Sequence, residues 1–264
     1  MTDAAPSALT RAAFLGHGSP MNALERNRYT EAWKDFGAAG PKPRVVLMVS
    51  AHWYIAATAM TAMAQPRTIH DFGGFPQALF DVRYPAPGMP ALVEEVAELL
   101  RPTPVLADAR QWGLDHGSWS VLRHLYPAAD VPVVQLSIDT RLTPAQHFEL
   151  GLRLATLRQR GVMLMASGNV VHNLRAIDWQ RPGAVFDWAR DFNEHARELI
   201  TTRPEDAATL IEHPDYARAA PTPEHFLPLL YFAGWAVGSG SKPAVLVDGY
   251  AHGSLSMTAY TLSD

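Results

Sequence analysis

The sequence predicts a three-layer α/β/α fold built on a mostly parallel central sheet. Short runs of apolar and β-branched residues recur along the chain, and most of them lack the polar alternation of half-exposed strands. Such runs are typical of interior strands in a parallel sheet. Segments with apolar residues at three-to-four spacing lie between several of the runs, and this alternation indicates helices packed on both faces of one sheet.

The predicted elements follow the two patterns in order. Seven apolar runs are expected to be strands, at residues 12–16, 44–51, 58–63, 103–107, 131–138, 161–167 and 243–249. Four periodic segments are expected to be helices, at residues 24–36, 89–100, 144–160 and 186–200. The third of these has Thr143 as its N-cap and Pro144 in its first position. A further buried helix is expected after Phe226, where the most apolar stretch is too short to span a bilayer.

The chain length and composition predict one domain. Of the 264 residues, 48% are hydrophobic and 18% are charged, and no Gly/Ser-rich linker divides them. This length suits one large α/β unit. We therefore expect residues 1–264 to form a single domain, with residues 1–11 as a flexible N-terminus. The longest irregular segment, residues 65–87, is expected to shape a binding pocket.

Composition also excludes several classes of function. The net charge of -4 and the absence of a basic cluster argue against nucleic acid as a partner, and no segment predicts a membrane span. The N-terminal residues do not resemble a signal peptide, so a cytoplasmic location is expected. With no cysteine, any metal site must use His, Asp or Glu. Neither a nucleotide-binding glycine motif nor a G-x-S-x-G element is present.

The 11 histidines are the unusual feature of the sequence, and three of them follow predicted strands. His17 follows residues 12–16, His52 follows residues 44–51, and His172 follows residues 161–167. Because ligands of an open α/β sheet bind at the carboxyl ends of its strands, these side chains are expected to converge. The sequence therefore predicts a site at this edge.

Other histidines divide into candidates and structural residues. His70 and His116 lie in loops that contain glycine, and His225 lies at the start of a helix. Glycines beside His17 and His116 would let the backbone approach a ligand closely. Histidines within helical patterns are expected to be structural, namely His124, His147 and His195. A structural role is favoured over a functional one for His213 and His252, although both roles stay open.

Neighbouring polar and aromatic residues leave alternatives open. Asp115 could orient His116 or simply form a turn. Ser19 and Ser118 each follow a His-Gly pair, so a Ser-His hydrolase has to be considered, although adjacency in sequence does not place a hydroxyl against an imidazole. Four aromatic residues flank the histidine loops and could be core or could wall an aromatic substrate, namely Trp53, Tyr54, Trp112 and Trp119.

Several motifs, taken in order, resemble those of a known family. They are "FLGHGSPMNAL", "MVSAHW", "TIHDFGGFPQALFDVRYPAPG", "DHGSWSVL", "QLSID", "ASGNVVHNLR", "PTPEHFLPLLY" and "GSLSM". Over residues 14–257 the chain resembles the DOPA 4,5-dioxygenase subgroup of the LigB-type (class III) extradiol ring-cleavage dioxygenases. The resemblance implies a single catalytic domain with a LigB-like, phosphorylase/hydrolase-like α/β fold. It also implies a metal-dependent enzyme that opens a catechol such as DOPA with O2.

The resemblance also implies roles for particular residues. His17, His52 and His225 would be metal ligands, with Glu224 as the alternative to His225. His172 would be a fourth ligand when zinc is bound, and otherwise an acid/base. His116 would lie on the oxygen side and donate a proton. Fe(II) would serve activity, and Zn(II) would be able to occupy the same site.

Two other functions remain open from the sequence. One is a zinc-dependent hydrolase on a related scaffold, with His172 or Glu224 as the base. The other is a non-catalytic zinc-binding protein. The sequence fixes neither the preferred catechol nor the oligomeric state.

Overall fold

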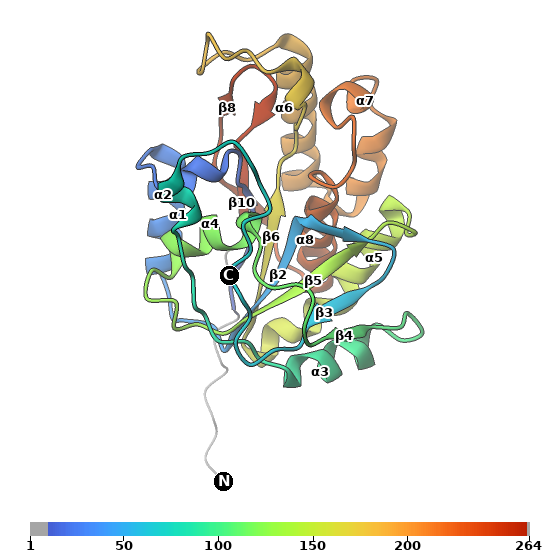
Figure 1. Cartoon of the computed structure of the whole chain (residues 1–264). Coiled ribbons are helices and arrows are strands. Elements are labelled where there is room, and N and C mark those ends of the chain that lie inside the picture. The colour runs from blue at the N-terminus through green and yellow to red at the C-terminus, as the bar shows by residue number, and fades with distance from the viewer. Residues whose placement is uncertain (1–9, 263–264) are drawn as a thin grey trace.

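The computed structural model describes residues 10–262 and contains one eight-stranded sheet with the strand order β4-β3-β5-β2-β6-β1-β10-β7 (Figure 1). Its strands are β1 Ala12–Gly16, β2 Val45–Ile55, β3 Ala59–Thr61, β4 Leu106–Asp108, β5 Val133–Asp139, β6 Val162–Gly168, β7 Pro243–Val247 and β10 Ala259–Leu262. A separate two-stranded ribbon pairs β8 Tyr250–Ala251 with β9 Leu255–Ser256.

The centre of the sheet is parallel, as predicted. Strands β5, β2, β6 and β1 are parallel neighbours, whereas β10 pairs antiparallel with both β1 and β7. The sequence did not predict β10, whose four residues include Thr261 and form no continuous apolar run. The carboxyl ends of β1, β2 and β6 therefore lie at one edge of the sheet.

Helices cover both faces of the sheet, which confirms the three-layer architecture. Val45, Leu47 and Val49 of β2 pack into one core, and the alternate residues Val46 and Met48 pack into the other. The first core is closed by α3 Ala91–Leu99, α5 Pro144–Leu154, α6 Asp187–Thr202 and α8 Leu227–Gly238. The second is closed by α1 Arg28–Ala38, α2 Gln77–Phe80 and α4 His116–Leu125 (Figure 1). The remaining helical segments are α7 Tyr216–Ala219 and the 3-10 helices Pro20–Ala23, Ala155–Arg160, Leu174–Ala176 and Pro204–Glu212.

Local capping explains where the helices depart from prediction. The helix expected at residues 24–36 begins only at Arg28, because the Asn27 side chain accepts hydrogen bonds from the amides of Tyr29 and Thr30. The helix expected at residues 144–160 becomes a 3-10 helix after Leu154.

Strand β2 runs further than predicted, so His52 lies inside it rather than beyond its end. Its ladder with β6 stops at Ser50, whereas Tyr54 and Ile55 pair with β5 after a register shift. His52 falls within this irregular stretch, where the strand bends out of the regular ladder.

Of the predicted flexible N-terminus, residues 1–9 lie outside the described part. The two described residues are held to the domain. Thr10 donates a hydrogen bond to the Arg158 carbonyl, and the Arg11 guanidinium donates to that of Phe36. Across residues 10–262, no helix combines the length and apolar character needed to cross a membrane.

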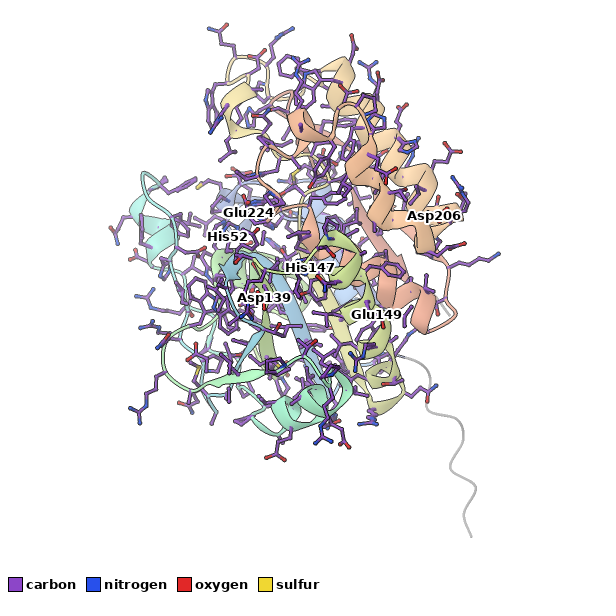
Figure 2. All side chains as sticks on the ribbon, turned by 90° about the vertical axis from the view of Figure 1, so that its right-hand side faces the viewer. His52, Asp139, His147, Glu149, Asp206 and Glu224 are labelled. Atoms are coloured by element: carbon purple, nitrogen blue, oxygen red, sulfur yellow. The ribbon has the colours of Figure 1, made fainter. Side chains whose placement is uncertain are left out.

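The histidine of α5, His147, makes stability depend on pH. Its ring is fully buried, its Nδ1 lies 3.0 Å from the Tyr231 hydroxyl, and its Nε2 has no hydrogen-bond partner in the described part of the chain (Figure 2). Burial lowers the pKa of His147 to about 4, although the charge of Asp139 acts in the opposite direction. As pH falls below 6.5, His147 therefore binds a proton in the unfolded chain but stays neutral in the folded protein.

We expect His147 to remove up to about 3 kcal/mol of stability between pH 7 and pH 4. His147→Gln cannot titrate, so urea unfolding should show a smaller loss in this variant over the same interval. The exposed His195→Gln serves as the control and should follow the wild type. Parallel stability curves for the wild type and His147→Gln would contradict this account.

A candidate metal centre of five histidines

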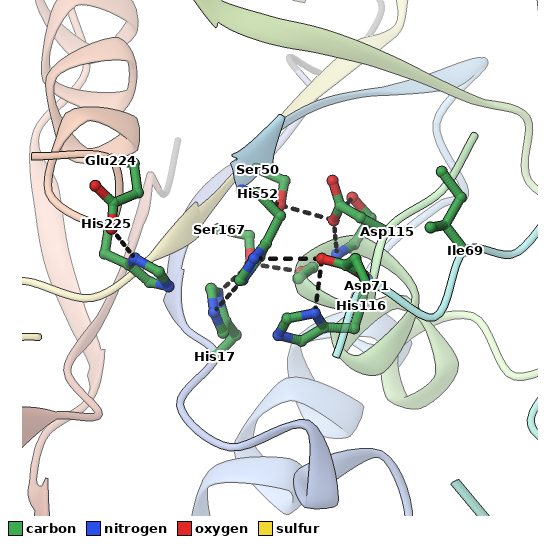
Figure 3. Close-up of polar contacts among 12 residues, drawn as sticks. His17, Ser50, His52, Ile69, Asp71, Asp115, His116, Ser167, Glu224 and His225 are labelled. Carbon is green, nitrogen blue, oxygen red and sulfur yellow. Dashed lines mark hydrogen bonds and ion pairs between the residues drawn. The ribbon is translucent and has the colours of Figure 1, made fainter. Parts of the chain in front are cut away.

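Five histidines meet at the carboxyl edge of the sheet, and Figure 3 shows four of them, His17, His52, His116 and His225. One directly follows β1, one lies in β2, one begins α4, one follows β6 and one precedes α8. The ring centroids are separated by 5.1 Å for His17–His52, 3.8 Å for His52–His116, 5.0 Å for His52–His225 and 3.4 Å for His172–His225. The predicted convergence of His17, His52 and His172 therefore occurs, and His116 and His225 join it.

The hydrogen bonds of His17 determine which ring nitrogen faces the centre. The Ser167 hydroxyl donates its single proton to the Gly117 carbonyl at 2.6 Å. Ser167 Oγ, 2.9 Å from His17 Nδ1, must therefore accept a hydrogen bond from that nitrogen. The neutral ring of His17 then carries its lone pair on Nε2.

Asp71 imposes the same orientation on two further rings. One of its carboxylate oxygens lies 2.9 Å from His116 Nδ1 and 3.3 Å from His52 Nδ1, and the other accepts a hydrogen bond from the His116 amide (Figure 3). Since a carboxylate only accepts, His116 Nδ1 is a donor, and the nearby negative charge favours a proton on His52 Nδ1 as well. His52 Nε2 and His17 Nε2 then face each other at 3.2 Å.

This arrangement fits a metal cation. His17, His52 and His116 each offer a nitrogen within 4.8 Å of the others, and their lone pairs converge with no proton to separate them. A cation relieves that repulsion, and imidazole nitrogen is a ligand for both iron and zinc. The residues present therefore fit a transition metal.

A second group adjoins the first. His172, Glu224 and His225 also bring ligand atoms within 4.8 Å of one another. The Glu224 carboxylate accepts a hydrogen bond from Thr222 at 2.7 Å, and the same oxygen lies 3.2 Å from His225 Nδ1. His225 Nε2 is therefore the nitrogen left for a ligand, and the His172 ring stacks on that of His225 at an interplanar angle of 5°.

Burial keeps four of the clustered imidazoles neutral. It is the largest cause that lowers the pKa of His17 and His225 well below the usual value, and the neighbouring histidines add to it. Burial likewise lowers the pKa of His52 to about 3 and that of His172 to about 4. Neutral rings are the form that metal coordination requires.

Asp115 lies beneath the cluster and acts as a cap rather than as an orienting partner of the His116 ring. Its carboxylate accepts hydrogen bonds from Ser50 Oγ at 2.8 Å and from the Ser118 amide at 3.1 Å, and this second bond caps α4. Burial and the nearby Asp71 raise the pKa of Asp115. The cap makes His116 the first residue of a helix, which corrects its predicted place in a loop.

The glycines beside the histidines serve close packing, not the approach of a ligand. A Cβ on Gly16 would lie 2.8 Å from the Met257 backbone, and one on Gly117 would lie 2.8 Å from the His52 ring. Gly18 has a φ of +59°, which favours glycine in the turn after His17.

Neither serine next to a His-Gly pair touches a clustered ring. Ser19 Oγ accepts a hydrogen bond from the Met21 amide, and Ser118 Oγ lies against Gln135 and Asp115. Nothing in this arrangement supports a serine nucleophile.

The cluster lies in the wall of a cavity of about 760 Å³. Phe72 and Phe75 line it, which agrees with the expected role of residues 65–87. Its other aromatic residues are Tyr29, Trp179 and Tyr250. None of the four aromatics singled out in the sequence lines the cavity, and two of them, Trp53 and Trp112, stack on each other at 5.7 Å.

Sequence reasoning missed Asp71 and Ser167. Asp71 follows His70, which had looked like the candidate in this segment, but His70 Nε2 bonds to the Val82 carbonyl outside the cluster. An acidic residue inside a long irregular segment was the one available signal for Asp71. No local pattern identifies its partners, because His116 lies 45 residues away.

The fold and the site define a class of protein. The family described as "Catalytic LigB subunit of aromatic ring-opening dioxygenase" matches residues 12–262, so the chain belongs to the LigB family. Enzymes of this family are metal-dependent and act on a small aromatic molecule with O2. The hydrolase and binding-only alternatives are therefore not favoured.

Particular relatives sharpen this placement and confirm the predicted subgroup. The chain is 52% identical over 252 residues to 4,5-DOPA dioxygenase extradiol of Escherichia coli K12, a match that covers 93% of this chain and 92% of the relative. It is 33% identical over 256 residues to the protein of that name from Beta vulgaris, with 94% of each covered. A crystal structure of an uncharacterized protein from Escherichia coli K12 superposes with a TM-score of 0.85 at 44% identity, covering 96% of this chain and 100% of the other.

The contacts of Asp71 predict an effect on metal binding. Asp71→Asn removes the negative charge and one of the two accepting oxygens, so either the Nδ1 side or the His116 amide loses its acceptor, and we expect Zn(II) affinity to fall by about tenfold to a hundredfold. Isothermal titration calorimetry on the metal-free protein measures this change. Asp81→Asn, in the same segment but exposed, is the control and should bind as the wild type does. Equal affinities in all three proteins would show that Asp71 does not orient the ligands.

Proposed function

We propose that this protein is an Fe(II)-dependent extradiol dioxygenase that opens the ring of a catechol such as DOPA. The observation that carries the proposal is the convergence of neutral imidazole Nε2 atoms on one wall of a cavity large enough for a substituted catechol. The substrate named for the relatives supports DOPA as the first catechol to test.

We infer that His17, His52 and His225 hold the metal, since the His225 ring lies 5.3 Å from that of His17 and 5.0 Å from that of His52. His116, which also offers a nitrogen within 4.8 Å of His17 and His52, is assigned to proton transfer. His17 and His52 already present Nε2 to each other at 3.2 Å. For the third position we favour His225, because Glu224 Oε1 lies against its Nδ1 and leaves Nε2 as its ligand atom, and the same oxygen also accepts from Thr222. This network leaves the lone pair of His225 Nε2 free to bind a metal.

His172 and His116 are suited to proton transfer. His172 lines the cavity, and no other described residue hydrogen-bonds to its ring, so the ring can take a proton from a catechol hydroxyl or serve as a fourth ligand when zinc is bound. His116 also lines the cavity, and Asp71 holds its Nδ1, so its Nε2 lone pair is placed to take up a proton and then to return it as the ring opens. When bound, Fe(II) supplies the redox centre through which the catechol and O2 react. Both oxygen atoms end in the product, so no external reductant is needed.

Oxygen uptake tests this proposal directly. Protein loaded with Fe(II) under argon and then given DOPA and air should consume one O2 per catechol and form a coloured ring-opened semialdehyde. His17→Ala removes a ligand and should lower this activity by at least about a hundredfold. The exposed His195→Ala is the matched control and should keep full activity. Absence of oxygen uptake across a panel that includes DOPA and protocatechuate would overturn the function.

The identity of the bound metal needs its own measurement. The nitrogen-rich donor set accepts Zn(II) as well as Fe(II), so zinc should occupy the same site without supporting oxygen uptake. Metal analysis of protein purified without chelators tests this, and substantial oxygen uptake by the zinc form would contradict it. The cytoplasmic location stays a prediction.

A further inference from the structure

His252 has an unusual backbone conformation in the cavity wall. It lies between β8 and β9 with a φ of +53°, and Gly253 follows with a φ of +82°. Asparagine or glycine forms such a turn at lower cost than a residue with a large side chain. A strained residue at a cavity suggests a role for its side chain.

The surroundings of the His252 ring fix which nitrogen it presents. Its Nδ1 is buried and has no hydrogen-bond partner in residues 10–262. An unpaired N–H is costly when buried, so the neutral ring carries its proton on Nε2, the accessible nitrogen. The ring also lies 5.1 Å from that of Trp179, which is 73% exposed and lines the same cavity. His252 therefore offers an N–H donor beside an aromatic surface.

The cavity wall is poor in other groups that could bind an anion. None of the described lining residues is Lys or Arg. The side chains of Asn22 and Asn27 are held by each other and by the backbone. Glu25 is the one carboxylate on the wall and complements an ammonium group. Away from the five-histidine cluster, His252 is the side chain best suited to a negatively charged substituent.

The turn that carries His252 is connected to the histidine cluster. Leu255, three residues after His252, forms a β-bridge with His172. Three residues span at most about 10 Å, so the turn lies near the reacting ring. The backbone of His252 is in turn bonded to Asp178 and Pro182, which holds it against the segment that carries Trp179.

We propose that His252 binds the carboxylate of the catechol's ring substituent through Nε2, and so selects amino-acid-like catechols over uncharged or purely cationic ones. This assignment rests on the proposed function, which it makes more specific. Glu25 would face the ammonium group of the same substituent.

Four catechols and two variants test His252. DOPA and 3-(3,4-dihydroxyphenyl)propionate carry a carboxylate, whereas dopamine and 4-methylcatechol do not. His252→Gly and His252→Asn both suit the left-handed turn, but only asparagine keeps a donor. With His252→Gly, KM for the two carboxylate-bearing catechols should rise about ten- to a hundredfold, with kcat little changed. KM for the other two should stay as in the wild type, and His252→Asn should recover part of the loss.

Two results would overturn the assignment. One is an equal change for all four catechols, which would indicate a merely structural role. The other is an unchanged KM for the carboxylate-bearing pair in His252→Gly. If no catechol is turned over, the proposed function fails instead. Anaerobic calorimetric binding of 3-(3,4-dihydroxyphenyl)propionate against 4-methylcatechol, in wild type and His252→Gly loaded with Zn(II), still decides the role of His252.

Discussion

The structure depends on a cluster of buried imidazoles that present the same nitrogen to one another. Each outward nitrogen is anchored by an acceptor, namely Ser167 for His17, Asp71 for His52 and His116, and Glu224 for His225. The anchors leave the Nε2 lone pairs facing inward, where they repel one another and lack partners. Unpaired buried polar groups cost about 1–3 kcal/mol each, and a bound cation removes that cost. Metal binding is therefore expected to stabilise the folded protein as well as to serve its chemistry.

The fold brings this cluster together from all three layers. His17, His52 and His172 come from strands β1, β2 and β6, which are direct neighbours in the sheet although they are far apart in sequence. His116 enters on α4 from one face, and His225 enters beside α8 from the other. No single layer can form the site, so the packing of helices against the sheet controls its geometry. For example, a Cβ on Gly117 of α4 would lie 2.8 Å from the His52 ring in β2, so glycine lets this helix pack closely against the sheet.

The sequence predicted what local patterns report and missed what depends on distant pairing. Apolar runs located β1 within its observed bounds, and placing His17 after it needed no further information. The run before His52 gave no sign that β2 would continue to Ile55, because the pairing of that segment with β5 decides where it ends. The role of Asp71 was missed for the same reason, since its partner His116 lies 45 residues away in the chain. The sequence left open whether the four aromatic residues near the histidines were core or cavity wall, because proximity in sequence to a histidine does not decide this, and none of the four lines the cavity.

The cavity wall has one part held rigidly by hydrogen bonds and another part formed by exposed turns. The histidine cluster stands on strand ends and helix starts, and Asp71, Ser167 and Glu224 hold its rings, so its side chains have little freedom. Another part of the wall is formed by turns and a 3-10 segment, around Leu174, Trp179 and His252, where Leu174 and Trp179 are exposed. Loops tolerate change better than the elements that position them. Substitutions in the β8–β9 turn can therefore alter which ring substituent is accepted while leaving the hydrogen bonds of Asp71, Ser167 and Glu224 in place. Substrate preference and metal chemistry are thus separable in this fold.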